Sequence, residues 1–149
     1  MATDDNLRLE HQLCVALYDA SRAIVGCYRP LLAELGITYS QYTVLLVLWE
    51  RDTATLRDLG EVLHLDSATL SPMVKRLEAA GPLTRRRGAH GERLLDVTIT
   101  DAGRRLRDGA SAAQRSVEQL TGLDPAELAA LRDQLNELTA RTRRLDLAG

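Results

Sequence analysis

The sequence has no phenylalanine, and its aromatic residues, one Trp and four Tyr, make up only 3% of the chain. Without large aromatic rings, the core must be built from Leu, Val, Ile and Ala. That composition favours helices over an all-β fold, because Leu and Ala are strong helix formers and strands are enriched in aromatic residues.

Cysteine is also scarce, with only Cys14 and Cys27, which is too few for a disulfide scaffold or a zinc ribbon. No run of residues approaches the roughly 18 uninterrupted apolar positions that a membrane span needs. The first ten residues lack the basic start and apolar run of a signal peptide. We therefore expect a cytoplasmic protein with reduced thiols that makes no contact with a membrane.

The charge of the chain is small overall but unevenly distributed. A length of 149 residues with 45% hydrophobic and 27% charged residues is typical of one globular domain. The net charge of -2 excludes a uniformly basic nucleic-acid binder. Residues 75–107, however, contain nine Lys and Arg against four acids, a net charge of +5, which leaves -7 for the rest.

Helical periodicity dominates the first third of the chain. Apolar residues at steps of three and four predict a helix over 6–35 that Pro30 bends or breaks and Gly36 ends. The run TVLLVLW that follows suits a buried strand or a buried helix. The spacing of Tyr42, Leu45 and Trp49 favours a helix over 39–51, although periodicity alone does not decide so short a run.

A helix pair followed by a hairpin is predicted next. Residues 55–64 and 67–80 form two short amphipathic segments, joined by a turn and stopped by Gly81 and Pro82. The second helix begins either at Asp66, which places Pro72 beyond its first turn, or at Ser71 as a cap. The segments 83–87 and 94–99 flank a Gly-bounded turn and predict a β-hairpin.

Two further helices complete the prediction, one capped by Thr100 and one begun by Asp124 and Pro125. The fold class is therefore mainly α with a small β-wing, a winged helix-turn-helix.

The basic window coincides with the second helix of the pair and the hairpin. This is the charge distribution expected when a helix enters the major groove and a flanking wing follows the phosphates, although such a run is also found on solvated faces. The candidate DNA contacts are Ser67, Thr69, Ser71, Lys75 and Arg76 on the helix, with Arg85, Arg86 and Arg87 in the hairpin.

Cys14 lies on an apolar helical stripe, where a cysteine is either a small core residue or a redox sensor held near hydrogen-bond donors. Tyr28 lies fourteen residues further along the same predicted helix, about 21 Å away at a rise of ~1.5 Å per residue. The two residues therefore meet only if two copies of the helix pack antiparallel. Cys27, Tyr18, Tyr42 and Trp49 are expected to be packing residues. No metal-ligand spacing, phosphate loop or pair of catalytic carboxylates appears, so we expect no cofactor and no enzyme.

Three segments resemble the MarR family of regulators, namely residues 9–50, LDSATLSPMVKRLEAAG (65–81) and LLDVTITDAG (94–103). Within that family, the elements QLC, YRPLL and ITYSQY are similar to those of the organic hydroperoxide resistance regulators, OhrR.

The resemblance implies a homodimer built from helices within 6–36 and 101–147, with 38–100 as the DNA-binding lobe. It further implies that Cys14 is the reactive cysteine, that Tyr28 and Tyr39 hydrogen-bond to it from the partner subunit, and that Arg93 enters the minor groove. The sequence departs from the family at Gly91, where an acidic residue is common, and at Pro82, where an aliphatic residue is usual.

The leading hypothesis is a transcriptional repressor whose reduced dimer binds a pseudo-palindromic operator. Oxidation of Cys14 by an organic hydroperoxide, followed by capping with a small thiol or by overoxidation, releases the DNA and derepresses a peroxide-detoxification gene. The alternatives are a repressor that senses a phenolic or aromatic ligand, with Cys14 only structural, a thiol peroxidase, and an interaction module without DNA binding.

Overall fold

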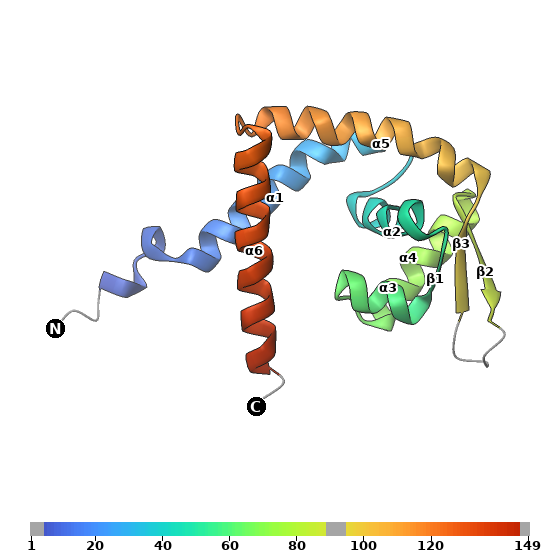
Figure 1. Cartoon of the computed structure of the whole chain (residues 1–149), viewed down its shortest axis with the longest axis horizontal. Helices are drawn as coiled ribbons and strands as arrows, with labels where there is room; N and C mark the ends of the chain where they lie inside the picture. The colour runs from blue at the N-terminus through green and yellow to red at the C-terminus, as the bar shows by residue number, and fades with distance from the viewer. Residues whose placement is uncertain (1–4, 89–94, 147–149) are drawn as a thin grey trace. The chain divides into compact units, whose positions relative to one another are not determined.

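The computed structural model describes residues 5–88 and 95–146, and Figure 1 shows its helices and strands. Arg93 and Gly91 lie outside the described residues. The chain divides into two compact units, Met1–Ala113 and Gln114–Gly149. The elements, in chain order, are two 3₁₀ turns (Asp5–Leu7 and Leu9–His11), α1 (Leu13–Ala33), α2 (Tyr39–Arg51), β1 (Thr53–Thr55), α3 (Leu56–Leu63), α4 (Ser67–Ala80), β2 (Leu83–Arg87), β3 (Leu95–Ile99), α5 (Asp101–Leu120) and α6 (Pro125–Asp146). The predicted fold class, mainly α with a small β-wing, is confirmed.

The first helix is shorter than its periodicity predicts. Gln12 has an extended backbone and separates α1 from the two 3₁₀ turns. Its side-chain amide donates hydrogen bonds to the carbonyl oxygens of Asn6 and Arg8, so the turns are fastened to the start of α1 instead of continuing it. Pro30 does not break the helix, which runs on to Ala33, three residues before Gly36 at φ +75°.

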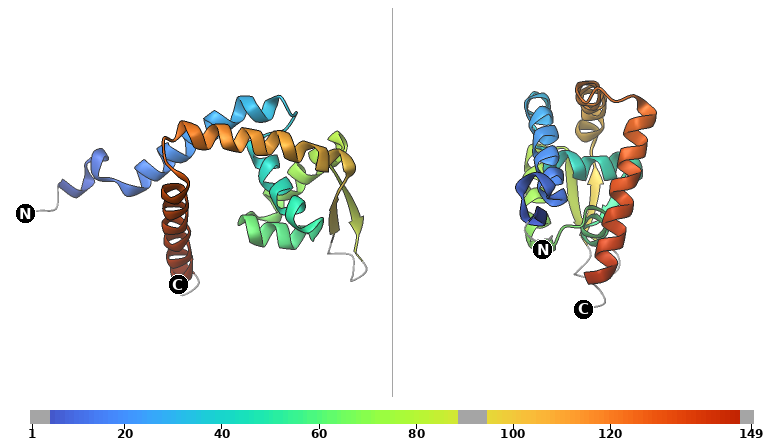
Figure 2. Two further views of the ribbon diagram at one scale, coloured as in Figure 1. Left: turned by 45° about the horizontal axis from the view of Figure 1, so that its top comes forward. Right: turned by 90° about the vertical axis from the view of Figure 1, so that its left-hand side faces the viewer.

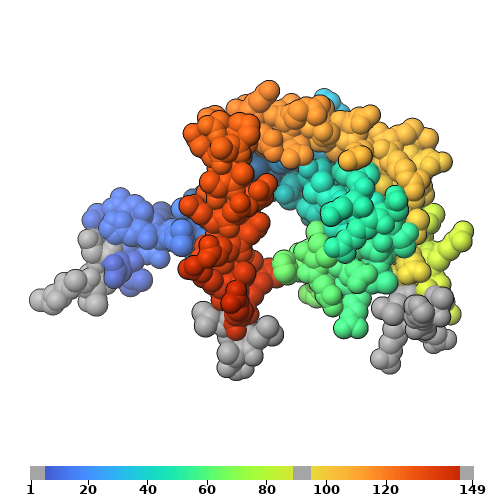
Figure 3. Space-filling view, viewed as in Figure 1, coloured from blue at the N-terminus to red at the C-terminus, as the bar shows by residue number. Residues whose placement is uncertain are grey.

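The ambiguous apolar run is a helix. Thr38 and Gln41 form a reciprocal capping box at the start of α2, because each side chain accepts the other's backbone N–H at 3.2 and 3.0 Å. Val44, Leu45 and Leu48 are fully buried. The surface over α2 and α3 is continuous in the space-filling view (Figure 3).

The helix-turn-helix pair is confirmed, and its caps decide where α4 begins. Asp66 accepts the backbone N–H of Thr69 at 2.7 Å, so Asp66 is the cap and Ser71 lies inside the helix with Pro72. His64 ends α3 in a left-handed conformation, and Gly81 ends α4 at φ +110°. Leu70, Val74 and Leu77 form the buried face of α4.

The hairpin belongs to a three-stranded antiparallel sheet with strand order β1-β3-β2. β2 pairs with β3 from Leu83 opposite Ile99 to Arg87 opposite Leu95. β1, a strand of only three residues, was not predicted from the sequence. Its Thr53 hydroxyl lies 3.0 Å from the hydroxyl of Thr98 on β3. Figure 2 shows the sheet beside the helices of the same unit.

The first turn of α5 is fixed to the end of α4. The Thr100 hydroxyl accepts the Gly103 N–H at 3.1 Å, as the predicted cap requires, and it donates to the Gly81 carbonyl at 2.6 Å. The Thr100 N–H also donates to the Pro82 carbonyl at 3.0 Å. A Cβ added at Gly103 would lie 2.2 Å from that same carbonyl oxygen, so only glycine permits this contact.

The second unit holds the end of α5 and α6. Asp124 caps α6 by accepting the Glu127 N–H at 2.8 Å, as predicted. Leu131 and Leu135 remain 45% and 37% exposed along α6. Across the described helices of both units, none is long and apolar enough to cross a bilayer.

Replacing Gly103 by Ala is expected to lower the free energy of unfolding by about 1–3 kcal/mol, because backbone atoms must move to admit the methyl group. Gly109→Ala is the matched control, since its Cβ would meet only the side chain of Leu35, which can rotate. Urea unfolding measures both variants. An equal or larger loss of stability in Gly109→Ala would contradict this account of the junction.

Candidate DNA-binding lobe and cysteine sensor

The predicted contacts on α4 lie outside its buried face. Ser67, Thr69, Lys75 and Arg76 are exposed, and Ser71 is half-buried. Because Leu70, Val74 and Leu77 hold the other side of the helix in the core, the polar side is presented outward as one strip. This strip has the form of a recognition surface.

Asp66 adds a fixed negative charge at the start of this strip. Its pKa is lowered from its ordinary value by hydrogen bonds from the backbone and then the side chain of Thr69. The cap itself is formed by the Thr69 N–H, which donates to Asp66 at 2.7 Å. A contact between the Thr69 side chain and DNA stays a prediction.

Arg85 has a role that the charge pattern did not reveal. Its guanidinium donates to Oε1 of Glu78 at 3.0 and 3.1 Å, and its backbone N–H donates to Oε2 at 2.8 Å. The Arg85 side chain is only 23% exposed. Arg85 thus forms a brace that ties β2 to α4, and a contact between Arg85 and DNA stays a prediction. Arg86 and Arg87 are exposed and remain candidate contacts.

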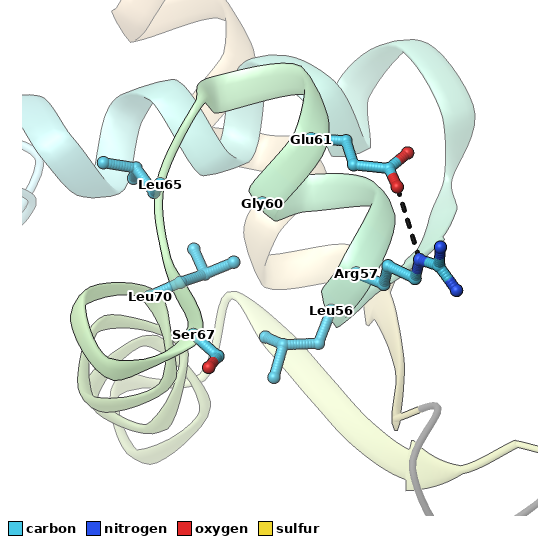
Figure 4. Close-up of a pocket in the computed structure, with 7 residues that line it drawn as sticks. All are labelled: Leu56, Arg57, Gly60, Glu61, Leu65, Ser67 and Leu70. Atoms are coloured by element: carbon cyan, nitrogen blue, oxygen red, sulfur yellow. Dashed lines mark hydrogen bonds and ion pairs between the residues drawn. The ribbon is translucent and has the colours of Figure 1, made fainter. Parts of the chain in front are cut away.

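A cleft of about 380 Å³ lies between α3 and the start of α4 (Figure 4). Leu56, Leu65 and Leu70 line it with apolar surface, and Ser67 lies at its α4 side. The charged groups at its edge, Arg57 and Glu61, pair with each other at 3.3 Å. Gly60 also lines it, and a Cβ there would lie 2.9 Å from the Leu65 carbonyl oxygen. The cleft is therefore the packing seam of the helix-turn-helix.

The two cysteines are free thiols with different surroundings. Cys14 is exposed in the first turn of α1, and Cys27 is half-buried further along the same helix. Exposed apolar side chains surround the Cys14 region, with Leu9 74%, Leu13 63% and Tyr18 63% exposed. The expected packing role of Tyr18 is thus not met within one chain, where its ring instead lies 4.6 Å from the Arg22 guanidinium carbon.

Tyr28 and Tyr39 come together although they belong to different helices. Their ring centroids are 5.4 Å apart, and Tyr42 lies 5.5 and 5.7 Å from them. Tyr28 is 9% exposed and Tyr42 is 5% exposed, so Tyr42 is the packing residue that was predicted. Its contact with both phenols was not predicted. Only its position three residues after Tyr39 on a helical face signalled it.

A helix-turn-helix followed by a small antiparallel sheet defines a winged helix-turn-helix transcriptional regulator. Comparison with known proteins agrees with this class. A family model described as the transcriptional regulator SarA/Rot matches residues 27–109.

Two curated relatives and one solved structure narrow the class. The chain is 47% identical over 106 residues to the organic hydroperoxide resistance transcriptional regulator of Bacillus subtilis (strain 168), covering 71% of this chain and 72% of that protein. It is 42% identical over 148 residues to the HTH-type transcriptional regulator TtmR of Methylorubrum extorquens (strain PA1), covering 97% and 76% of the two chains. Reduced AbfR bound to DNA matches with a TM-score of 0.79 at 36% identity, over 95% of this chain and 97% of that chain.

AbfR, from Staphylococcus epidermidis, has also been solved overoxidized on DNA and in a disulfide form. Together the family model and these relatives show that the chain belongs to the winged helix-turn-helix transcriptional regulators, in the family of the organic hydroperoxide resistance regulators. The predicted resemblance is confirmed.

The contact between Arg85 and Glu78 predicts that the stability of the DNA-binding lobe falls at acidic pH. Hydrogen bonds from the Arg85 side chain, then from its backbone, hold the pKa of Glu78 below its ordinary value of 4.5. A carboxylate that is more acidic when folded stabilises the fold fully above its ordinary pKa, and this contribution is lost as the pH falls through the lowered value. We expect Glu78→Gln to unfold at a lower urea concentration than the wild type at pH 7, with the difference shrinking below about pH 4.5.

Glu61→Gln is the control for this comparison, because the Arg57–Glu61 pair is well exposed and such pairs contribute little. Urea midpoints measured from pH 7 down to pH 3 decide the matter. A gap between wild type and Glu78→Gln that stayed constant over that range would show that the ion pair does not stabilise the lobe.

Proposed function

We propose that this protein is a redox-sensing transcriptional repressor. The reduced homodimer binds operator DNA, and oxidation of Cys14 by an organic hydroperoxide releases it. The convergence of Tyr28 and Tyr39 at 5.4 Å is the observation that carries the sensing part, because it gathers two phenols into one cluster. The winged lobe and the regulators named above support the DNA-binding part.

In the proposed complex α4 lies in the major groove. Its outward strip meets base edges and phosphates, and Arg86 and Arg87 follow the backbone beside it. A homodimer presents two such strips, which suits a pseudo-palindromic operator. We assign the dimer contact to helices within 6–36 and 101–147, and the DNA-binding lobe to 38–100. The exposed leucines near Cys14 and along α6 support this assignment.

The sensing step is a two-electron oxidation of sulfur. The Cys14 thiolate attacks the terminal oxygen of the hydroperoxide, so that an S–O bond forms while the O–O bond breaks. The leaving alkoxide takes up a proton and becomes the alcohol. Sulfur is oxidised to a sulfenic acid, and the hydroperoxide is reduced to the alcohol.

Two phenols hold the reactive form of the cysteine. Cys14 and Tyr28 are fourteen residues apart on the unbroken helix α1, about 21 Å at ~1.5 Å per residue, so they do not meet within one chain. In the antiparallel dimer, the Tyr28 and Tyr39 hydroxyls of one subunit donate to the thiolate of the other. The added oxygen of the sulfenic acid enlarges the group and displaces both phenols.

The oxidised sulfur then reacts with a small thiol. A second thiol displaces the sulfenic hydroxyl as water and leaves a mixed disulfide on Cys14. Cys27 is thirteen residues away on the same helix, about 20 Å, whereas a disulfide needs Cα atoms within roughly 7 Å. It therefore takes no part within its own chain.

Replacing Cys14 by Ser is expected to preserve DNA binding and abolish its release by hydroperoxide, because serine is close to cysteine in size but forms no sulfenic acid. Gel shifts on the DNA upstream of the gene, with and without cumene hydroperoxide, measure the response. Cys27→Ala is the control and should respond like the wild type. Release of DNA from the oxidant-treated Cys14→Ser protein would place the sensor elsewhere.

Replacing both exposed wing arginines, Arg86 and Arg87, by Ala is expected to weaken DNA binding uniformly across sequences. The slope of log K against log salt should become shallower by about 0.9 for each phosphate that the wing no longer neutralises. Arg132→Ala on α6 is the matched control, with unchanged affinity expected. An unchanged slope in the double variant would remove both arginines from the interface.

A further inference from the structure

A continuous line of contacts joins the phenols to the far end of α2. Tyr42 contacts both Tyr28 and Tyr39, and on its other side its ring lies 6.3 Å from that of Trp49 in an edge-on arrangement. The indole Nε1 of Trp49 donates a hydrogen bond to the Gly103 carbonyl at 2.9 Å. Trp49 is thus the point at which the aromatic cluster is tied to α5.

The residue that receives this bond is held firmly on its other side. Gly103 packs so closely on the Pro82 carbonyl that a Cβ would lie 2.2 Å from the oxygen. Its N–H is bonded to Thr100, whose hydroxyl holds the residue that ends the recognition helix, Gly81. A displacement of the Trp49 ring therefore reaches the end of α4 and the base of the wing through this single turn.

The hydrogen bond is not needed to satisfy the carbonyl. In a regular helix the Gly103 oxygen also accepts the N–H of Arg107, four residues on. A phenylalanine at position 49 would keep an aromatic ring beside Tyr42 and lose only the N–H donor. The hydrogen bond from Trp49 consequently serves to link α2 to α5, and it is not required to satisfy a buried polar group.

We propose that Trp49 is a positioning residue that couples the tyrosine cluster to the recognition helix and the wing. This inference rests on the proposed function, and it names the route by which oxidation at Cys14 lowers DNA affinity. When the sulfenic acid displaces Tyr28 and Tyr39, Tyr42 moves with them. Through its hydrogen bond to Gly103, the Trp49 indole then displaces the first turn of α5. That turn is bonded to the end of α4 through Thr100 and Gly81.

Trp49→Phe separates sensing from response. We expect the reduced variant to bind the upstream DNA within about twofold of the wild type, and Cys14 to be oxidised by cumene hydroperoxide at the wild-type rate. The ratio of the oxidised to the reduced Kd should fall by roughly 2- to 30-fold, the range for substitutions that alter coupling between sites. A merely structural role would lower the affinity of the reduced protein as well.

Arg104→Gln is the matched control, because it removes a different link to the first turn of α5, the 3.4 Å ion pair with Asp52. It leaves the contacts among the tyrosines and Trp49 intact. Arg104→Gln should keep the full response to hydroperoxide.

Trp49 is the only tryptophan, so its fluorescence reports directly on the surroundings of this ring. Its emission should shift on oxidation in the wild type and stay constant in Cys14→Ser.

Each remaining outcome has one meaning. If wild-type protein keeps its DNA after Cys14 is oxidised, the proposed function fails. If the wild type releases DNA and Trp49→Phe releases it equally well, the function stands and the role of Trp49 is overturned. A variant that loses reduced affinity, or whose Cys14 is oxidised more slowly, also overturns it, as does a wild-type emission that oxidation leaves unchanged.

Discussion

The close approach of Gly103 to the Pro82 carbonyl is the constraint on which the DNA-binding lobe depends. It places the start of α5 directly on the turn between α4 and β2. Thr100 donates hydrogen bonds to the carbonyl oxygens of both residues of that turn, Gly81 and Pro82. Ile99, one residue earlier, donates its N–H to the carbonyl of Asp52 and so fixes the corner between α2 and β1. The recognition helix, the wing and the first strand thus share one anchored turn.

Local chemistry made much of this fold predictable, and long-range contacts account for what was missed. The capping residues Thr100 and Asp124, and the glycines that bound the predicted turn between the segments 83–87 and 94–99, are local signals, so the neighbouring helices and strands were predicted correctly. β1 has three residues and no period, and it exists only because β3 lies beside it. The paired state of Arg85 likewise depends on Glu78, which belongs to another element.

The sensor shows the same limit more sharply. Cys14 stood out through its surroundings in sequence, but the cluster around Tyr42 arises where α1 and α2 pack. The spacing of Tyr39 and Tyr42 on α2 signals their own contact and does not reveal that Tyr28 of α1 joins them. A single chain also leaves Leu9 and Leu13 beside Cys14 in solvent. Such exposure is costly for large apolar groups, at about 25 cal/mol for each Å² left in water. In the proposed dimer, the second copy that covers them is also the one that brings the phenols to the thiol.

The order of the sheet has a further consequence for the row of arginines on β2. Because β2 is an edge strand, one side of its backbone has no neighbouring strand in the described sheet. Unprotected edges of this kind invite pairing with strands of other molecules, and charged side chains are a common safeguard. Arg86 and Arg87 stand on that edge in solvent. The residues that we propose to attract the phosphate backbone thereby also guard the free protein against aggregation, which limits how far evolution can dispense with them when DNA affinity needs to be lowered.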